Sequence, residues 1–269
     1  MNIAAYLDRI RVSRPVRPDL ATLDALHRAH LKAIPFENLD VQLGRPVSQD
    51  RDAVFDKLVR RHRGGWCYEM NGLFGWTLKE IGFDVTRLSA GVMRGQTGDA
   101  NMGSHLCLLV RLPDPYLVDV GFGGAMRAPL PLVAGQSRDP PYLVSLSQTD
   151  DGYWRFAEKL GADAPFTFDF RAEAADEAQL AARCTFLQRD AASPFVQNLV
   201  VQRRGGGGVH ITLRGRVLTH LSTSRAQPTL LQSADELVRT LRDTFGIEAP
   251  EAANLWPRVC ARHAQLFGV

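Results

Sequence analysis

The sequence lacks any apolar run close to the roughly 20 residues that a membrane-spanning helix requires. Residues 1–9 contain neither the basic region nor the apolar region of a secretory signal peptide. The four cysteines are widely spaced and form no Cys-x-x-Cys pair; they are Cys67, Cys107, Cys184 and Cys260. This pattern favours free thiols in a reducing compartment over disulfides or a zinc site. We therefore expect a cytoplasmic protein without a bound metal.

A strong excess of charge of one sign is also missing. The formal net charge is only +3, from 32 basic and 29 acidic residues, and only four of the basic residues are lysines. The arginines are scattered along the chain instead of forming a patch. Proteins that bind nucleic acid or an anionic membrane usually show such a patch. We therefore expect neither nucleic acid nor a membrane as a partner.

What is present is typical of a globular protein. The 269 residues include 45% hydrophobic and 23% charged residues, which is enough apolar material for a packed core. The length favours about two domains, with one or three also compatible.

The N-terminal third is predicted to be helical. Asp19 is a suitable N-cap for a helix that ends before Pro35, because the residue before a proline is disfavoured in the helical region. A second helix is expected over residues 50–61. A third is expected to begin just after Gly64-Gly65 and to end at Gly82.

From residue 84 onward the pattern is that of strands. They are expected over residues 85–92, 142–146, 153–157 and 166–170, with a hairpin of 105–110 and 116–121 around Pro113. A glycine-rich loop is expected over 95–103 and a helix over 172–182. The last third mixes strands over 198–202 and 209–213 with a helix that a Ser233–Glu236 capping box opens and Gly246 ends. Helices, then antiparallel strands, then a mixed segment indicate an α+β fold.

Cys67 is a candidate nucleophile. Most free cysteines are small buried apolar side chains, but Cys67 follows two glycines and opens a helix. The positive end of the helix dipole and the nearby Arg63 would favour a thiolate there. The other three cysteines lack this context and are expected to be structural.

A nucleophilic cysteine needs a base and a group that orients the base. With a three-residue turn centred on Pro113, Arg111 faces Pro115 and Asp119 faces Cys107. His105 and Asp119 then become diagonal neighbours on one face of the hairpin, within side-chain reach. A turn centred on Asp114 would break this contact. Alone, a strand histidine is more often structural.

The other histidines and the glycine tract give no comparable indication of a functional site. The remaining histidines lack a carboxylate at a comparable position, and His27 and His30 lack further metal ligands. The tract Gly205–Gly208 matches neither phosphate-loop fingerprint, so a flexible hairpin connection is the better interpretation.

Several motifs together resemble one family. Residues 63–71 (RGGWCYEMN) resemble the active-site segment of the arylamine N-acetyltransferases, and 35–39 (PFENL) resemble the signature upstream of it. The stretch from His105 through 116–123 (YLVDVGFG) is similar to their His and Asp strands. Residues 193–195 and 213–218 also fit, so the resemblance spans nearly the whole chain.

The resemblance implies a Cys67–His105–Asp119 triad in a papain-like cysteine-enzyme core. Its three parts would be a helical bundle (1–83), an antiparallel β-barrel (84–192) and an α/β lid (193–269). It implies ping-pong acetyl transfer from acetyl-CoA to an arylamine, hydrazine or arylhydroxylamine.

The resemblance also implies binding residues around the triad. Phe122, Gly123 and Gly124 would line the acceptor pocket, and Gly103 and Ser104 would contact the coenzyme. The sequence departs from the family at Gly91, where many members carry arginine, and in a hairpin turn one residue tighter. We further expect Glu37 to pair with Arg63 and hold the active-site turn.

Two alternatives use the same residues differently. A thiol hydrolase or amide synthase could employ the same triad on another acyl donor, since Cys-His-Asp geometry serves several reactions. A non-catalytic binding module could keep the fold, although intact Cys67, His105 and Asp119 argue against it.

Overall fold

The computed structural model describes residues 1–13, 15–124, 126–205, 208–222 and 226–268. The N-terminal helices are α1 (Ile3–Ile10), α2 (Leu20–Ala33), α3 (Leu39–Gln42), α4 (Arg51–Phe55) and α5 (Cys67–Ile81). Asp19 caps α2 through the Thr22 N–H, and Gly82 ends α5 with φ +106°, both as predicted. The helix expected over 50–61 changes pitch within its span, since a π-helical segment (Asp56–Arg60) continues α4.

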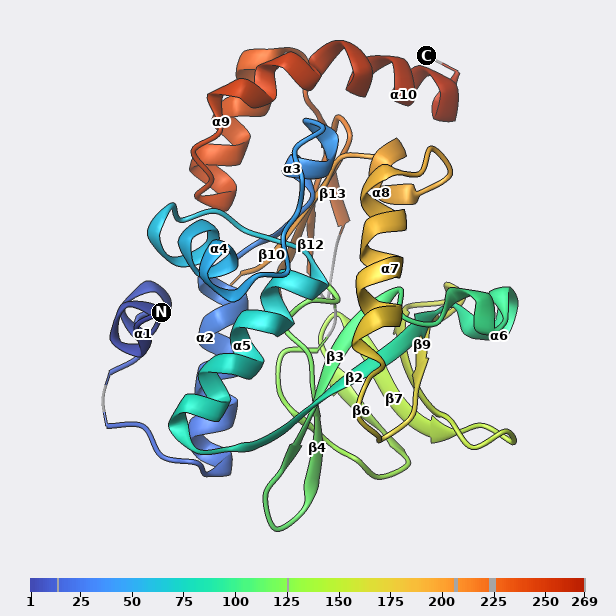
Figure 1. The fold of residues 1–269 in the computed structure, drawn as a ribbon. Coiled ribbons are helices and arrows are strands. Elements are labelled where there is room, and N and C mark those ends of the chain that lie inside the picture. The colour runs from blue at the N-terminus through green and yellow to red at the C-terminus, as the bar shows by residue number, and fades with distance from the viewer. Residues whose placement is uncertain (14, 125, 206–207, 223–225, 269) are drawn as a thin grey trace.

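A curled eight-stranded antiparallel sheet follows these helices (Figure 1). Its strands are β2 (Asp84–Val92), β3 (His105–Arg111), β4 (Pro115–Val118), β5 (Leu130–Pro131), β6 (Gly135–Asp139), β7 (Tyr142–Gln148), β8 (Trp154–Leu160) and β9 (Phe166–Phe170). Their order in the sheet is β5-β4-β3-β2-β9-β8-β7-β6. The expected glycine-rich loop contains a short helix α6 (Arg94–Thr97) and a 3-10 turn (Asp99–Asn101).

The helix expected over 172–182 is shifted toward the C-terminus. Helix α7 runs over Glu177–Arg189, because Asp176 accepts hydrogen bonds from the N–H groups of Ala178 and Gln179 and so fixes its start. The short α8 (Pro194–Gln197) follows. In Figure 1, α7 runs between the eight-stranded sheet and the C-terminal elements.

A second antiparallel sheet has the order β1-β10-β11-β12-β13. It joins β1 (Phe36–Glu37) to β10 (Val200–Arg204), β11 (His210–Arg214), β12 (Val217–Leu221) and β13 (Ala226–Leu230). Helix α9 (Ala234–Phe245), a 3-10 segment (Pro250–Leu255) and α10 (Trp256–Phe267) complete the chain. Part of the tract Gly205–Gly208 lies outside the described residues, at positions 206–207.

The capping box predicted for α9 forms only in part. Ser233 Oγ accepts the Glu236 N–H at 3.1 Å, but the Glu236 carboxylate accepts from the Gln232 N–H instead of that of Ser233. The predicted α+β class is confirmed by this arrangement of helices and antiparallel sheets. Within the described ranges, none of the helices combines the length and the apolar character needed to cross a bilayer.

Candidate active site

Cys67 is the first residue of α5, and only 5% of its surface is exposed. The two glycines before it allow close contact with the segment around β1. A Cβ atom on Gly64 would lie 2.2 Å from the Pro35 carbonyl oxygen, which real side chains do not tolerate. The Glu37 N–H donates to the Gly65 carbonyl at 3.0 Å. The turn that presents Cys67 is therefore bonded to the PFENL segment.

A cluster of charged side chains packs beside the turn that precedes Cys67. Arg63 donates two hydrogen bonds to Glu37 Oε1, at 2.7 and 3.0 Å, as the sequence predicted. Lys57 Nζ lies 2.7 Å from Asp40 Oδ2 and 2.8 Å from Glu69 Oε1. Glu69 also accepts the Trp66 N–H at 3.2 Å. We call Glu37, Asp40, Lys57, Arg63 and Glu69 the ion cluster.

His105 and Asp119 meet as the predicted register requires. Arg111 pairs with Pro115 and Leu109 with Leu117, so the turn is centred on Pro113. His105 Nε2 lies 2.6 Å from Asp119 Oδ2, and both residues are 2% exposed. Asp119 follows the end of β4, where a free carboxylate would be costly to bury without such a partner.

Asn71 completes the support of Asp119, and the sequence interpretation assigned it no role. Its amide donates to Asp119 Oδ1 at 2.8 Å and to the Leu106 carbonyl at 2.6 Å. Its carbonyl accepts the Val120 N–H at 2.9 Å. Asn71 lies one helical turn after Cys67, so this spacing on one helix face was the available signal. Asn71 thus ties α5, which begins at Cys67, to β3 and to the residues that follow β4.

The electrostatics favour a charged histidine. Burial alone would lower the pKa of His105, but the Asp119 carboxylate and a hydrogen bond with Cys67 outweigh it and raise the pKa to about 10. Burial would raise the pKa of Asp119, yet His105, Asn71 and the Gly121 N–H lower it. An imidazolium at neutral pH can hold the proton that a cysteine thiol gives up.

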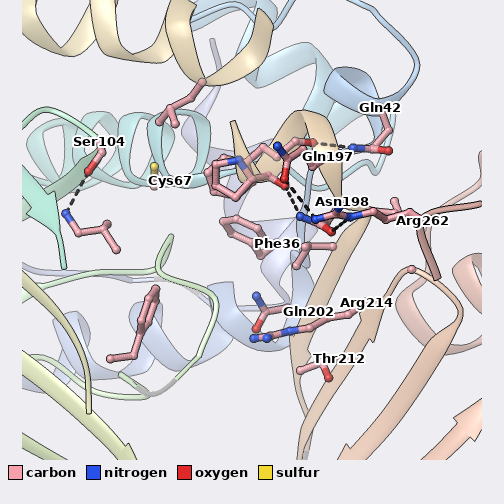
Figure 2. A pocket seen from close by; sticks show the side chains of 18 of the residues that line it. Phe36, Gln42, Cys67, Ser104, Gln197, Asn198, Gln202, Thr212, Arg214 and Arg262 are labelled. Atoms are coloured by element: carbon pink, nitrogen blue, oxygen red, sulfur yellow. Dashed lines mark hydrogen bonds between the residues drawn. The ribbon is translucent and has the colours of Figure 1, made fainter. Parts of the chain in front are cut away.

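A cavity of about 940 Å³ opens over Cys67 and His105. Phe122 lines it and stacks on Phe166, with the ring centroids 5.1 Å apart. Ser104 also lines it, and its hydroxyl accepts the Val92 N–H at 3.0 Å. Figure 2 shows Cys67 and Ser104 on one side of the cavity, and Gln202 and Arg214 farther from them.

None of the three predicted glycines, Gly103, Gly123 and Gly124, is among the described residues that line the cavity. The Gly103 carbonyl accepts the Tyr68 hydroxyl at 2.5 Å, and a Cβ atom on Gly103 would meet Gln179 of α7. Gly123, with φ +88°, lies against the Gln202 amide, and Gly124 lies against the Glu158 carboxylate. These glycines allow other residues to approach the cavity wall closely.

The cavity also contains residues that the sequence interpretation did not place there. Four arginines line it: Arg183, Arg214, Arg258 and Arg262. They come from α7, β11 and α10, and no local spacing relates these elements. Among the described residues, no group of three or more His, Cys, Asp or Glu side chains is placed to hold a metal ion.

Comparisons with known proteins agree with this geometry. A model of the N-acetyltransferase family matches residues 19–253. The chain is 37% identical over 264 residues to an arylamine N-acetyltransferase of Mycolicibacterium smegmatis, covering 94% of each. It is 30% identical over 294 residues to arylamine N-acetyltransferase 1 of Homo sapiens, covering 99% of each.

A solved structure of a related protein has a similar fold. The arylamine N-acetyltransferase of Mycobacterium marinum in complex with CoA superposes with a TM-score of 0.86 at 33% identity. The match covers 97% of this chain and 98% of that one. The present chain, with its cysteine helix set against a His–Asp hairpin, therefore belongs to the arylamine N-acetyltransferase family.

Proposed function

We propose that this protein transfers the acetyl group of acetyl-CoA to an arylamine, hydrazine or arylhydroxylamine, through a thioester on Cys67. The observation that carries the proposal is the 2.6 Å contact of His105 with Asp119, beside Cys67 at the start of α5. Family membership supports acetyl-CoA as the donor. The hydrolase and amide synthase alternatives share the triad, but no feature of the cavity favours them over the transferase.

In the first half-reaction, His105 holds the proton of the Cys67 thiol and the thiolate attacks the thioester carbonyl. The new S–C bond replaces the C–S bond to coenzyme A, whose thiolate leaves with the proton from His105. The Trp66 N–H is already donated to Glu69, so we assign the oxyanion contact to the N–H of Cys67 itself.

In the second half-reaction, the acceptor nitrogen attacks the acetyl carbonyl on Cys67. A C–N bond forms, the C–S bond breaks, and the proton of the amine passes to His105. Asp119 keeps Nε2 of His105 occupied throughout, which leaves Nδ1 for the sulfur and the acceptor. Phe122, beside His105, supplies an aromatic wall for the ring of the acceptor.

The proposal also covers the other predicted binding residues, the three segments of the chain and the cellular compartment. Ser104, which lines the cavity, is the proposed coenzyme contact. Gly103, Gly123 and Gly124 lie outside the lining, and their proposed contribution to binding is the close packing that a missing side chain allows. The division into 1–83, 84–192 and 193–269 assigns the nucleophile to the first segment and His105 and Asp119 to the second. We also propose that the protein acts in the cytoplasm, and the four free cysteines support this compartment.

The test is the intact-protein mass after brief incubation with acetyl-CoA and no acceptor, beside the Cys67→Ala variant. We expect one added acetyl group on the wild type, none on the variant, and its loss when an arylamine is added. No adduct, with Cys67 still rapidly alkylated by iodoacetamide, would contradict acetyl-CoA as the donor. No adduct and no alkylation would contradict the catalytic role of Cys67.

A further inference from the structure

One face of the five-stranded sheet forms a wall of the cavity. Val200 pairs with Arg214, and Arg214 pairs with Val217, so these three side chains form one row across the sheet. Gln202, Thr212 and Thr219 form the next row. All six residues line the cavity, because side chains of paired positions lie on the same face of a sheet.

The second row consists of neutral side chains that can donate hydrogen bonds, whereas the first places a guanidinium between two valines. Neither row therefore contains a group that could neutralise Arg214.

The charge of the whole cavity wall is also unbalanced. Among the described residues that line it, four are arginines and none is Asp or Glu. Three of the four are held by neutral acceptors: Arg183 by Asn101, Arg258 by the Val196 and Gln42 carbonyls, and Arg262 by Asn198. Arg214 has no hydrogen bond or ion pair with any residue that the structure describes. Its donors are therefore available to a ligand.

Arg214 is an exposed residue whose side chain forms part of the cavity lining. Figure 2 shows its side chain extending from β11 toward the amide of Gln202, with Thr212 beside it. Gln202 is 9% exposed, and its amide lies close to Gly123, where a Cβ atom would be 2.9 Å from Nε2. Its amide thus lies on the cavity side of the sheet, near the guanidinium of Arg214.

We propose that Arg214, with the amide of Gln202 and the hydroxyl of Thr212, binds an oxyanion of a substrate. Arginine recognises carboxylate and phosphate with two parallel hydrogen bonds, so the group bound is one of these. A phosphate would belong to the coenzyme, and a carboxylate would belong to the acceptor. The inference deepens the proposed function, since it assigns a charged recognition point to the same cavity.

The test measures binding without turnover, by calorimetry, on the wild type, Arg214→Gln and Arg214→Lys. Coenzyme A is compared with pantetheine, which lacks the phosphates. Separately, 4-aminobenzoate is compared with its neutral amide. The control is Arg239→Gln, which removes the same charge from the exposed face of α9, on the other side of the sheet.

We expect Arg214→Gln to lower the affinity for one of the two charged ligands about tenfold or more. The affinity for the neutral counterpart of that ligand should stay unchanged. Loss for coenzyme A identifies the phosphate source, and loss for 4-aminobenzoate identifies the carboxylate source. Arg214→Lys should retain part of the affinity. If the wild type and Arg214→Gln bind both charged ligands with equal affinity, the proposal is overturned. It is also overturned if Arg214→Gln loses as much affinity for the neutral ligands as for the charged ones, or if Arg239→Gln loses as much affinity as Arg214→Gln.

This outcome is separable from that of the proposed function. If Cys67 is acetylated but the charged ligands show no dependence on Arg214, only the oxyanion site is wrong. If acetylation fails, the calorimetric comparison still decides whether Arg214 binds an anion.

Discussion

At the scale of single residues, His105 is enclosed on two sides by aromatic rings. Its ring centroid lies 5.1 Å from that of Phe122 and 4.9 Å from that of Phe168. The two rings are tilted against the imidazole, at 59° and 51°, and pack it in place, while Asp119 favours its charged form.

The first prediction concerns the titration of this imidazole. We expect His105 to stay protonated up to a pH near 10, because Asp119 and Cys67 outweigh its burial. His27, buried without a charged partner close enough to offset its burial, should stay neutral down to a pH of about 4. Two-dimensional NMR of the imidazole groups, assigned with His105→Gln and His27→Gln, measures both.

The sign of the linked stability follows from the same shift. The raised pKa of His105 contributes stability that is complete below the unfolded value near 6.5 and is lost as the pH rises through about 10. A midpoint of His105 near 6.5 would show that Asp119 does not hold it in the charged form.

The contact between His105 and Asp119 could be predicted from the sequence, but the hydrogen bond between Asn71 and Asp119 could not. The first contact depends on the parity of one hairpin, which a short turn determines. The second depends on how α5 packs against β3, where Asn71 bonds the Leu106 carbonyl. That packing is set by the apolar core as a whole, so local spacing shows which helix face Asn71 occupies but not what lies opposite.

At the scale of elements, the ion cluster joins β1, α3, the π-helical segment and α5. Four of its side chains, Glu37, Lys57, Arg63 and Glu69, are buried, and the Asp40 side chain is 13% exposed. Burial of such groups is costly, but loss of one partner costs more, because the remaining charges stay buried and unpaired. The geometry of the Cys67 turn therefore depends on every member of the cluster.

The second prediction removes the lysine of this cluster. Lys57→Met should lower the free energy of unfolding by about 3–5 kcal/mol, because Asp40 and Glu69 lose their shared partner. Burial raises the pKa of Glu69, so the deficit should shrink as the pH falls and that carboxylate takes up a proton. Urea unfolding at pH 5 and pH 8 measures both effects.

The control for Lys57→Met lies on the same segment. Arg60 is 65% exposed and faces Asp56 at 3.7 Å, so Arg60→Met should change the stability by less than about 1 kcal/mol. Similar losses for the two variants would mean that burial of the cluster does not determine its contribution.

Elements with a buried face were predictable, and several edge strands were not. Asp19 and Gly82 mark the ends of their helices, and the continuous apolar run of β3, buried at its first six positions, marks a strand. Strand β13 is exposed at all five positions and contains Pro228, so neither alternation nor strand propensity reveals it. Strand β6 is also largely exposed. At the edge of a sheet, backbone pairing with a neighbour is sufficient without a sequence pattern.

At the scale of the whole molecule, segments distant in the sequence share their cores. Strand β1 pairs with β10, with Phe36 opposite Gln202 and Glu37 opposite Val201. Leu39 packs into the same apolar cluster as Leu241 and Phe245 of α9. The first and third segments expected from the sequence are therefore connected by a β-ladder as well as by side chains. Leu106 and Leu108 of the second segment belong to the same apolar cluster as Phe74 of the first.

The third prediction follows from this connection. We expect a single unfolding transition in urea, coincident for far-ultraviolet circular dichroism and for tryptophan fluorescence. Three tryptophans report on the three segments of the chain separately. Trp76 lies in α5, Trp154 in β8 and Trp256 in α10. Single-tryptophan variants with different midpoints would show that the segments unfold independently.

The cavity wall also has an order in time. The ribosome makes Cys67 early, His105 and Asp119 next, and the α10 residues of the wall last. A nascent chain that ends before β3 thus carries Cys67 without His105, and one that ends before α10 lacks Arg258 and Arg262 of the cavity wall. The wall that encloses Cys67 is therefore complete only once α10 has been made.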